Sequence, residues 1–195
     1  SGLLTGTGSL FSGRWMVTGK SPLTGGWGEA NCGGHFAPAI KRCGVDGIFF
    51  KGISPYPVYL YVDDHTAELR SAADLWGLDT VDTENQLARA LDNPKARIAC
   101  IGPSGEKMSL ISGVSTDKGR MAARSGLGAV MGSKQLKAVV LAGNCRITPH
   151  NRVEIKRLSQ ICNKWVKFQP PFVPGILTAP IGALMRIMPW VITQD

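Results

Sequence analysis

The sequence is poor in charged residues, in long apolar runs and in targeting signals, and each shortage excludes a class of protein. Charged residues make up 18% of the 195 residues and hydrophobic residues 44%, a balance that lets a core form and excludes intrinsic disorder. No apolar run reaches the roughly 18 residues of a membrane span. The longest, 176–192, is interrupted by Pro180, Arg186 and Pro189, and Ser1 begins no signal peptide. We expect a soluble, cytoplasmic protein that does not enter a membrane.

The cysteines and histidines of the sequence do not form the motifs that bind metals or catalyse reactions. The five cysteines are an odd number and none forms a C-x-x-C pair, which excludes a zinc knuckle and a disulfide framework. Cys100 lies in a strand pattern and is expected in the core. Cys32 lies inside a Gly-rich turn, where a reactive thiol is an open alternative. Of the three histidines only His35 lies in a plausible site, because His65 and His150 are expected to be exposed. No Ser/His/Asp set or carboxylate pair stands out, so no catalytic residue is assigned.

Positive charge is concentrated in the second half of the sequence. The net charge is +8 overall, made up of −1 over residues 1–103 and +9 over residues 104–195. A basic half indicates an anionic partner such as a phosphate-bearing cofactor, an acidic protein or a nucleic acid. The aromatic residues of this half all lie beyond its Gly-rich section, so the interleaved pattern typical of nucleic-acid binding is missing and no nucleic acid is expected. A solvated or interdomain basic face is the alternative.

The strand and helix patterns predict an α+β fold with two domains. The predicted strands are 14–18, 47–51, 57–62, 67–70, 97–101, 108–114 and 137–141. Two helices are predicted, over 82–91 with a capping box at Thr83 and Gln86, and over 152–168 from its amphipathic spacing. Strands and helices do not alternate as they would in a doubly wound parallel sheet. We place the boundary near Thr148, between a β-rich domain at 1–147 and the start of an all-helical domain at 148–195.

Two Gly-rich segments, 13–25 and 119–134, each contain an arginine among small residues followed by a lysine-bearing turn. Glycine lets backbone N–H groups approach an anion, and the planar arginine fork matches phosphate, so the pair favours a phosphate-bearing ligand with two similar halves. Neither the dinucleotide fingerprint nor the nucleotide-triphosphate loop has the required spacing here. The alternative is that these glycines serve tight turns and close packing, with Lys20, Lys134 and Lys137 in solvent.

Seven short blocks occur in an order that identifies a family. They are Lys20–Gly25, Asn31–Phe36, Lys41–Ile48, Pro57–Leu60, Leu75–Gly77, Ile101–Glu106 and Gly126–Ala138. This series resembles the N-terminal domain of the tungsten-containing aldehyde:ferredoxin oxidoreductase family over residues 1–143. Residues 148–195 resemble the start of that family's helical second domain. Because the sequence begins without Met and ends directly after an apolar stretch, we expect an interior fragment of a longer protein.

The resemblance implies a two-sheet domain on which a bis-pterin tungsten cofactor, or its molybdenum counterpart, lies. It implies that Arg14 and Arg120 contact the pterins, and that the backbone carbonyls of Asn31 and Met121 bind a Mg²⁺ ion that bridges the pterin phosphates. Family members usually carry Ala where Met121 stands, and a backbone contact tolerates that change. The other residues in cofactor-contacting stretches are Gly33, Ala122 and Arg124.

The implied reaction is the two-electron oxidation of an aldehyde to a carboxylic acid, with a [4Fe–4S] cluster that passes electrons to ferredoxin or a small iron–sulfur subunit. The cluster cysteines and the catalytic residues have no match in this sequence and are expected downstream of Asp195. Assembly into a homo-oligomer is left open. The alternatives are a family member that reduces an aromatic acyl thioester, a non-catalytic module that binds a phosphorylated ligand, and a structural protein without a ligand.

Overall fold

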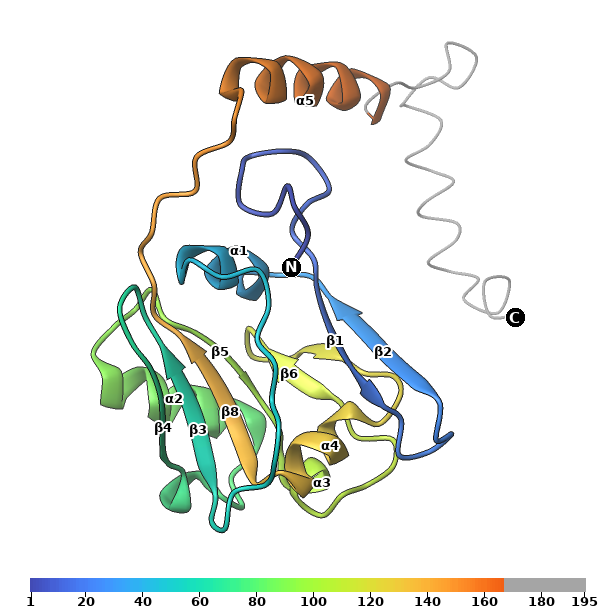
Figure 1. Cartoon of the computed structure of the whole chain (residues 1–195), viewed down its shortest axis with the longest axis vertical. Coiled ribbons are helices and arrows are strands. Elements are labelled where there is room, and N and C mark those ends of the chain that lie inside the picture. The colour runs from blue at the N-terminus through green and yellow to red at the C-terminus, as the bar shows by residue number, and fades with distance from the viewer. Residues whose placement is uncertain (167–195) are drawn as a thin grey trace, which may run out of the picture. The chain divides into compact units, whose positions relative to one another are not determined.

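The computed structural model describes residues 1–166, whose elements are drawn in Figure 1. The strands are β1 (Trp15–Lys20), β2 (Trp27–Cys32), β3 (Val58–Val62), β4 (Ala67–Ser71), β5 (Arg97–Cys100), β6 (Val114–Thr116), β7 (Arg120–Ala122) and β8 (Leu136–Leu141). The helices are α1 (Phe36–Arg42), α2 (Thr80–Leu91), α3 (Pro103–Glu106), α4 (Leu127–Ser133) and α5 (Arg152–Val166), with a 3-10 turn η1 (Ala73–Leu75). Within this range no helix has the length and apolar character to cross a membrane.

The chain divides into two compact units, Ser1–Ile155 and Lys156–Asp195. The predicted boundary at 147 stays a prediction, as does the helical second domain. The apolar run at 176–192 and the last residues of the helix predicted over 152–168 lie outside the described residues.

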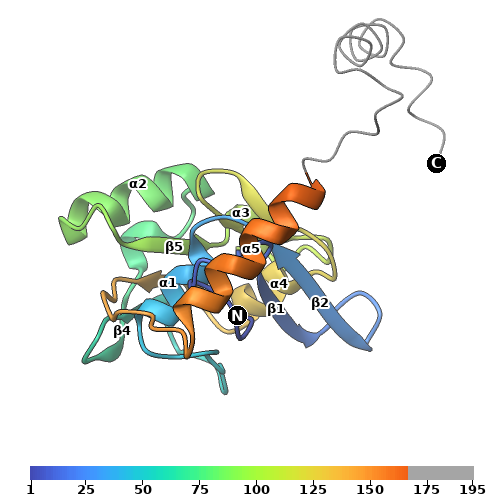
Figure 2. The same ribbon diagram turned by 90° about the horizontal axis from the view of Figure 1, so that it is seen from above.

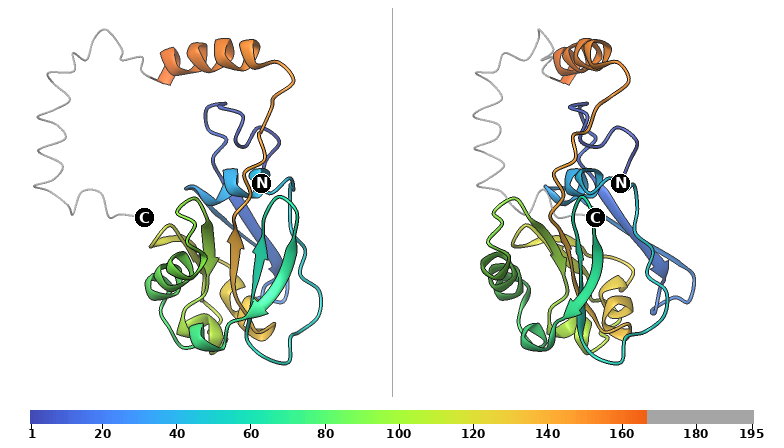
Figure 3. Two further views of the ribbon diagram at one scale, coloured as in Figure 1. Left: turned by 90° about the vertical axis from the view of Figure 1, so that its left-hand side faces the viewer. Right: turned by 60° about the vertical axis from the view of Figure 1, so that its left-hand side comes forward.

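Two sheets form the first unit. The larger has the strand order β4-β3-β8-β5-β6-β7, in which β3 and β8 run parallel and the other neighbours antiparallel. The smaller is the antiparallel pair β1–β2. Helix α2 covers one face of the larger sheet through β5 and β6, while α1, α4 and the smaller sheet lie on the other face (Figure 2, Figure 3). The predicted mixed architecture with two sheets is confirmed.

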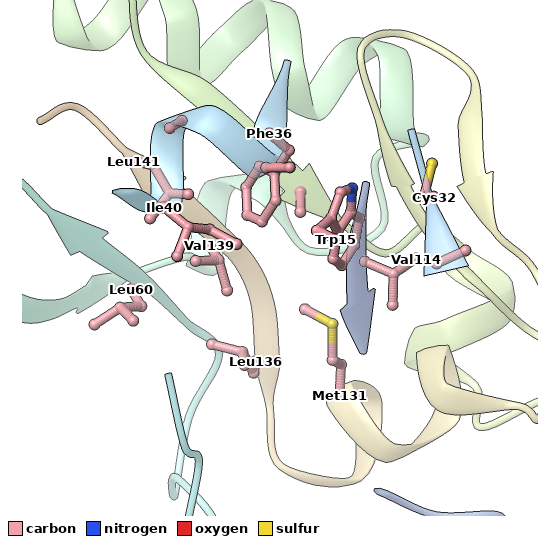
Figure 4. Packing of buried hydrophobic residues seen from close by; sticks show 14 of the residues in the cluster. Trp15, Cys32, Phe36, Ile40, Leu60, Val114, Met131, Leu136, Val139 and Leu141 are labelled. Carbon is pink, nitrogen blue, oxygen red and sulfur yellow. The ribbon is translucent and has the colours of Figure 1, made fainter. Parts of the chain in front are cut away.

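Strand β8 is the centre of this arrangement. All six of its residues are buried, as expected for a strand with helices or strands on both faces. Successive side chains point to opposite faces, so Val139 joins a cluster with β1 and α1 while Val140 joins a second cluster beneath α2. Figure 4 shows the first cluster, in which the rings of Trp15 and Phe36 lie with their centroids 4.8 Å apart. This cluster joins the two sheets into one core.

Helix α2 begins earlier than predicted. The Asp79 side chain accepts the Asp82 backbone N–H at 2.8 Å and so caps the helix. Thr83, predicted to be the cap, is buried, and its hydroxyl donates to the Asp79 carbonyl at 2.6 Å. The predicted capping box is wrong because an aspartate at the N-cap satisfies the free N–H groups and also complements the helix dipole.

The strands predicted at 47–51 and 108–114 are wrong. Both segments are rich in apolar residues, yet Phe49 is 98% exposed and Met108 has a φ of 57°. The segment after Phe49 is tied to Lys134 instead, whose carbonyl accepts a backbone N–H and whose ammonium donates to a backbone carbonyl. Apolar composition without a neighbouring strand to pair with does not make a strand.

Lys137 is buried, not solvated as predicted. Its side chain, at the second residue of β8, is 0% exposed, and it forms an ion pair with Glu106 of α3, whose side chain is 5% exposed. The ammonium also donates to a backbone carbonyl at 2.8 Å, and the carboxylate accepts a backbone N–H at 2.9 Å. Because both charges are hydrogen-bonded, the pair is tolerated in the interior and ties β8 to α3. Of the other two lysines, Lys20 is exposed as predicted and Lys134 is half-buried.

Glu106→Ala is expected to lower the free energy of unfolding by about 3–5 kcal/mol, because it leaves the Lys137 ammonium buried without a counter-charge. The double variant Glu106→Ala/Lys137→Met removes both charges and is expected to recover part of the loss. Urea unfolding of the chain measures both, with the exposed Lys95→Met as control. A loss of less than about 1 kcal/mol in Glu106→Ala, the value of a surface pair, would contradict this role.

Candidate anion-binding site

The smaller sheet has one exposed face, and the candidate site begins there. Residues of β2 alternate between exposed and buried, so Asn31 faces solvent while Cys32 is buried next to Trp15, its partner in β1. Met16, opposite Asn31 in the register, is 53% exposed. Arg14 immediately precedes β1 and reaches this same face through its hydrogen bonds to Asn31.

The guanidinium group of Arg14 is held by Asn31. Its Nε donates to Asn31 Oδ1 at 2.9 Å, and Nη2 donates to the same oxygen and, at 3.4 Å, to the Asn31 carbonyl. Among the described residues, Nη1 has no hydrogen-bond partner. Since the asparagine amide is neutral, it orients the arginine without neutralising its charge.

Arg120, the first residue of β7, also approaches Gly33. A Cβ atom added to Gly33 would be 3.9 Å from a terminal nitrogen of Arg14 and 3.9 Å from one of Arg120. The two nitrogens are therefore no more than twice that distance apart. Contacts between β2 and β7 bring these distant parts of the sequence together.

Three arginines near this turn in sequence or space lack an acidic partner. Ion pairs join Lys41 to Asp46, Arg70 to Glu68 and Lys137 to Glu106, and in the part of the chain that the structure describes none involves Arg14, Arg120 or Arg124. All three arginines are exposed. Two guanidinium groups that approach one glycine without an ion-pair partner favour a multiply charged anion.

Gly34 is the point at which two side chains meet the turn. It has a φ of +108°, and a Cβ atom there would lie 2.1 Å from Asp117 Oδ2 and 2.8 Å from Arg120 Cδ. The His35 backbone N–H donates to the same Asp117 oxygen at 2.7 Å. The His35 side chain is exposed, so the histidine contributes here through its backbone N–H. Only glycine fits position 34.

Helix α2 anchors the turn that carries Asp117. Asp117, Lys118 and Gly119 all have positive φ, at 50°, 57° and 136°. The Lys118 backbone N–H donates to both carboxylate oxygens of Glu84, each at 3.1 Å. Glu84 is 7% exposed, and burial raises the pKa of its carboxyl above the ordinary glutamate value. Neither Asp117 nor Glu84 was singled out by the sequence, where the Asp-Lys-Gly turn between two short strands was the one available signal.

The cysteines do not add a reactive group. Cys32 is buried, and its thiol donates to the Gly33 carbonyl at 3.3 Å. Burial raises the pKa of Cys32 more than the nearby Arg14 and Arg120 lower it, which favours the neutral thiol. Cys100 is fully buried, as predicted, and burial raises its pKa to about 12.

The glycines of the second Gly-rich segment serve packing. Cβ atoms added to three of them would fall 2.0–2.4 Å from backbone oxygens of other segments; these are Gly126, Gly128 and Gly132. Helix α4 therefore lies directly against α3 and the chain before β6. The packing alternative holds for these three positions, and the site depends on arginine side chains and the Gly33–Gly34 turn.

Four of the seven predicted cofactor residues come together: Arg14, Asn31, Gly33 and Arg120. The other three are in or just after β7, where Met121 is 47% exposed, Ala122 is fully buried and Arg124 is exposed. For all seven residues, contact with a cofactor stays a prediction. No group of three or more His, Cys, Asp or Glu side chains that would hold a metal ion occurs in residues 1–166.

Comparison with known proteins defines the class first: the chain matches the N-terminal domain of a family of oxidoreductases. The family model described as "Aldehyde ferredoxin oxidoreductase, N-terminal domain" matches residues 1–143. The chain belongs to the aldehyde ferredoxin oxidoreductase family. The resemblance carried by the seven sequence blocks is confirmed.

Individual relatives cover most of this chain. The tungsten-containing aldehyde ferredoxin oxidoreductase of Pyrococcus horikoshii is 43% identical over 155 residues, which are 80% of this chain and 24% of the relative. The aliphatic sulfonate oxidoreductase, WOR-like subunit, of Pyrococcus furiosus is 30% identical over 156 residues, and the match covers 73% of this chain and 25% of the relative. The structure of the active-site complex BamBC of benzoyl coenzyme A reductase with 1,5-dienoyl-CoA matches with a TM-score of 0.77 and 34% identity, over 84% of this chain and 24% of that chain. The chain thus spans about a quarter of the length of these relatives.

Gly34→Ala is expected to lower the free energy of unfolding by about 2 kcal/mol or more, because the new Cβ meets the Asp117 carboxylate and the backbone has a positive φ. Gly33→Ala is the matched control, since its Cβ would make only ordinary contacts at 3.9 Å. Urea unfolding of both variants and the parent checks this. Equal losses for the two glycines would contradict the geometry of the turn.

Proposed function

We propose that residues 1–143 are the platform for a bis-pterin tungsten cofactor, in an enzyme that oxidises aldehydes to carboxylic acids. The observation that carries this proposal is that Arg14 and Arg120 both approach Gly33 and that neither forms an ion pair among the described residues. Membership of the aldehyde ferredoxin oxidoreductase family and the tungsten-containing relatives support the choice of cofactor.

The residues present fit such a ligand. A cofactor with two phosphate groups is multiply anionic, and two guanidinium groups from separate segments supply a positive charge on each side of one turn. Gly33 leaves the space between them free of a side chain. For the Mg²⁺ ion, the proposed ligands are the backbone carbonyls of Asn31 and Met121, since oxygen is the ligand that Mg²⁺ prefers.

In this proposal the chain binds and orients while the cofactor supplies the two-electron redox chemistry. Asn31 fixes the direction of Arg14, so one arginine presents its free Nη1 in a defined orientation. Exposed Arg124 adds a third positive charge in the same stretch as Arg120. We place the [4Fe–4S] cluster, the catalytic residues and the contact with ferredoxin or a small iron–sulfur subunit in the remainder of the full-length protein.

A second candidate is a family member that acts on an aromatic acyl thioester. The observation that favours it is the structural match to the benzoyl coenzyme A reductase complex, with a TM-score of 0.77. Both candidates use the same platform, and molybdenum in place of tungsten would preserve it. The residues that surround the substrate would distinguish the two candidates.

Arg14→Ala and Arg120→Ala, each introduced into the full-length protein, are expected to reduce tungsten to about a tenth of the parent's content, because each removes a charge-assisted contact to a phosphate group. Plasma mass spectrometry of protein purified without oxygen measures this. Arg89→Ala, an exposed arginine in the last turn of α2, is the control and is expected to keep the parent's metal content. Circular dichroism is expected to show an intact fold for all three variants.

Two results would contradict the proposal. Unchanged tungsten in both variants would remove the arginines from the binding site. A parent protein with neither tungsten nor molybdenum would reject the oxidoreductase platform and favour the non-catalytic module that binds a phosphorylated ligand.

A further inference from the structure

We propose that Asp117 and Glu84 are positioning residues that hold Arg14 and Arg120 at a fixed separation around Gly33. The inference rests on the proposed function, because it assumes that the two arginines bind phosphate groups. It adds two carboxylates that contact no ligand themselves. They act on the site through backbone N–H groups.

Gly34 is where Asp117 and Arg120 meet. Both Asp117 Oδ2 and Arg120 Cδ lie within 2.8 Å of the position that a Gly34 Cβ would occupy. The aliphatic part of Arg120 therefore rests on the bare backbone of the turn beside the carboxylate. A shift of either Asp117 or the turn must displace the stem of Arg120.

The same carboxylate sets the conformation of the turn. Asp117 Oδ2 accepts the His35 backbone N–H at 2.7 Å, across a separation of 82 residues in the sequence. Gly33, two residues before His35, is flanked by the two guanidinium groups. One hydrogen bond thus connects the strand pair that carries Arg120 to the turn that follows Asn31, which holds Arg14.

Glu84 keeps Asp117 in place. Asp117 and Lys118 are non-glycine residues with positive φ, a strained conformation that needs support from its surroundings. The support is the pair of 3.1 Å hydrogen bonds from the Lys118 N–H to the Glu84 carboxylate. Glu84 belongs to α2, which packs on β5 and β6, so the turn is anchored to the main core.

The charges around Glu84 are consistent with this role. Asp117 and Lys118 face it from the β6–β7 turn, and Cys100 faces it from β5. The Lys118 backbone N–H favours the carboxylate, while burial and Asp117 oppose it. The buried Glu84 carboxyl, close to a second acid, accepts both hydrogen bonds from the Lys118 N–H.

Amide hydrogen exchange of the chain tests the connection directly. His35 and Lys118 are exposed residues, so their amide protons owe their protection to the two carboxylates. Glu84→Ala is expected to accelerate exchange at Lys118 and, through the turn, at His35. Asp117→Ala is expected to accelerate exchange at the His35 amide but not at the Lys118 amide. Amides of β8 are expected to keep the parent's rates, which separates this effect from global unfolding.

Binding of inorganic pyrophosphate, measured by calorimetry, tests the consequence for the site. Asp117→Ala and Glu84→Ala are each expected to raise the Kd about fivefold to tenfold, the effect of losing the order of one or two side chains. Asp117→Asn and Glu84→Gln keep an oxygen acceptor and are expected to bind within about twofold of the parent or more tightly. Asp74→Ala, an exposed acid elsewhere, is the control.

The contrast between alanine and amide variants separates positioning from electrostatics. If the carboxylates acted only through their negative charge, all four substitutions would tighten pyrophosphate binding. That result, or parent-like affinity in both alanine variants, would overturn the positioning proposal and leave the anion site intact. A parent chain that does not bind pyrophosphate would instead reject the anion site, and the positioning proposal with it.

Discussion

The burial of Trp15 is the constraint on which the site depends. Its indole ring packs against Phe36 of α1 with a centroid separation of 4.8 Å, and it lies in the cluster that joins the two sheets. Because side chains alternate along a strand, a buried Trp15 forces the flanking Met16 to the exposed face, and Arg14 enters that face from just before the strand. Trp15 Nε1 lacks a hydrogen-bond partner within residues 1–166, an unfavourable feature that the packing of a large ring offsets. The docking of one aromatic residue thus decides which residues of the smaller sheet can meet a ligand.

Glycine has two different roles in this domain, and only the tertiary structure separates them. Around Gly126 and Gly132 the missing Cβ lets backbone segments approach within distances that no side chain would permit. At Gly33 a Cβ would meet only guanidinium nitrogens at 3.9 Å, so the missing side chain leaves space between two cations. At Gly34 a carboxylate and an arginine stem occupy the position of the side chain. In the sequence these glycines look alike, because each role is defined by what lies opposite.

This dependence on partners also explains which predictions succeeded. The hairpin formed by β3 and β4, strands β5 and β8 and most of α2 were predicted from local patterns, and each lies where predicted. Helix α4 lies in the second Gly-rich segment and β2 lies between glycines, so local composition indicates turns at both, and packing overrides that preference. Lys137 was placed in solvent because its partner, Glu106, lies 31 residues earlier. In the site, the resemblance to a family identified Arg14 and Arg120, whereas Asp117 and Glu84 were missed because their partners are backbone N–H groups, which leave no pattern in the sequence.

The arrangement of the two acids explains why Arg120 stays free of an ion pair. Asp117 lies close enough to Arg120 for both to rest on Gly34, yet the two form no ion pair. The carboxylate is oriented instead by the His35 N–H, and the next acid, Glu84, is oriented by the Lys118 N–H. A carboxylate bound to Arg120 would compete with any anionic ligand and would cancel much of the local field. By accepting from backbone donors, the acids stabilise the turn and form no ion pair with Arg120, so the same few residues supply rigidity and leave the Arg120 guanidinium available to an anionic ligand.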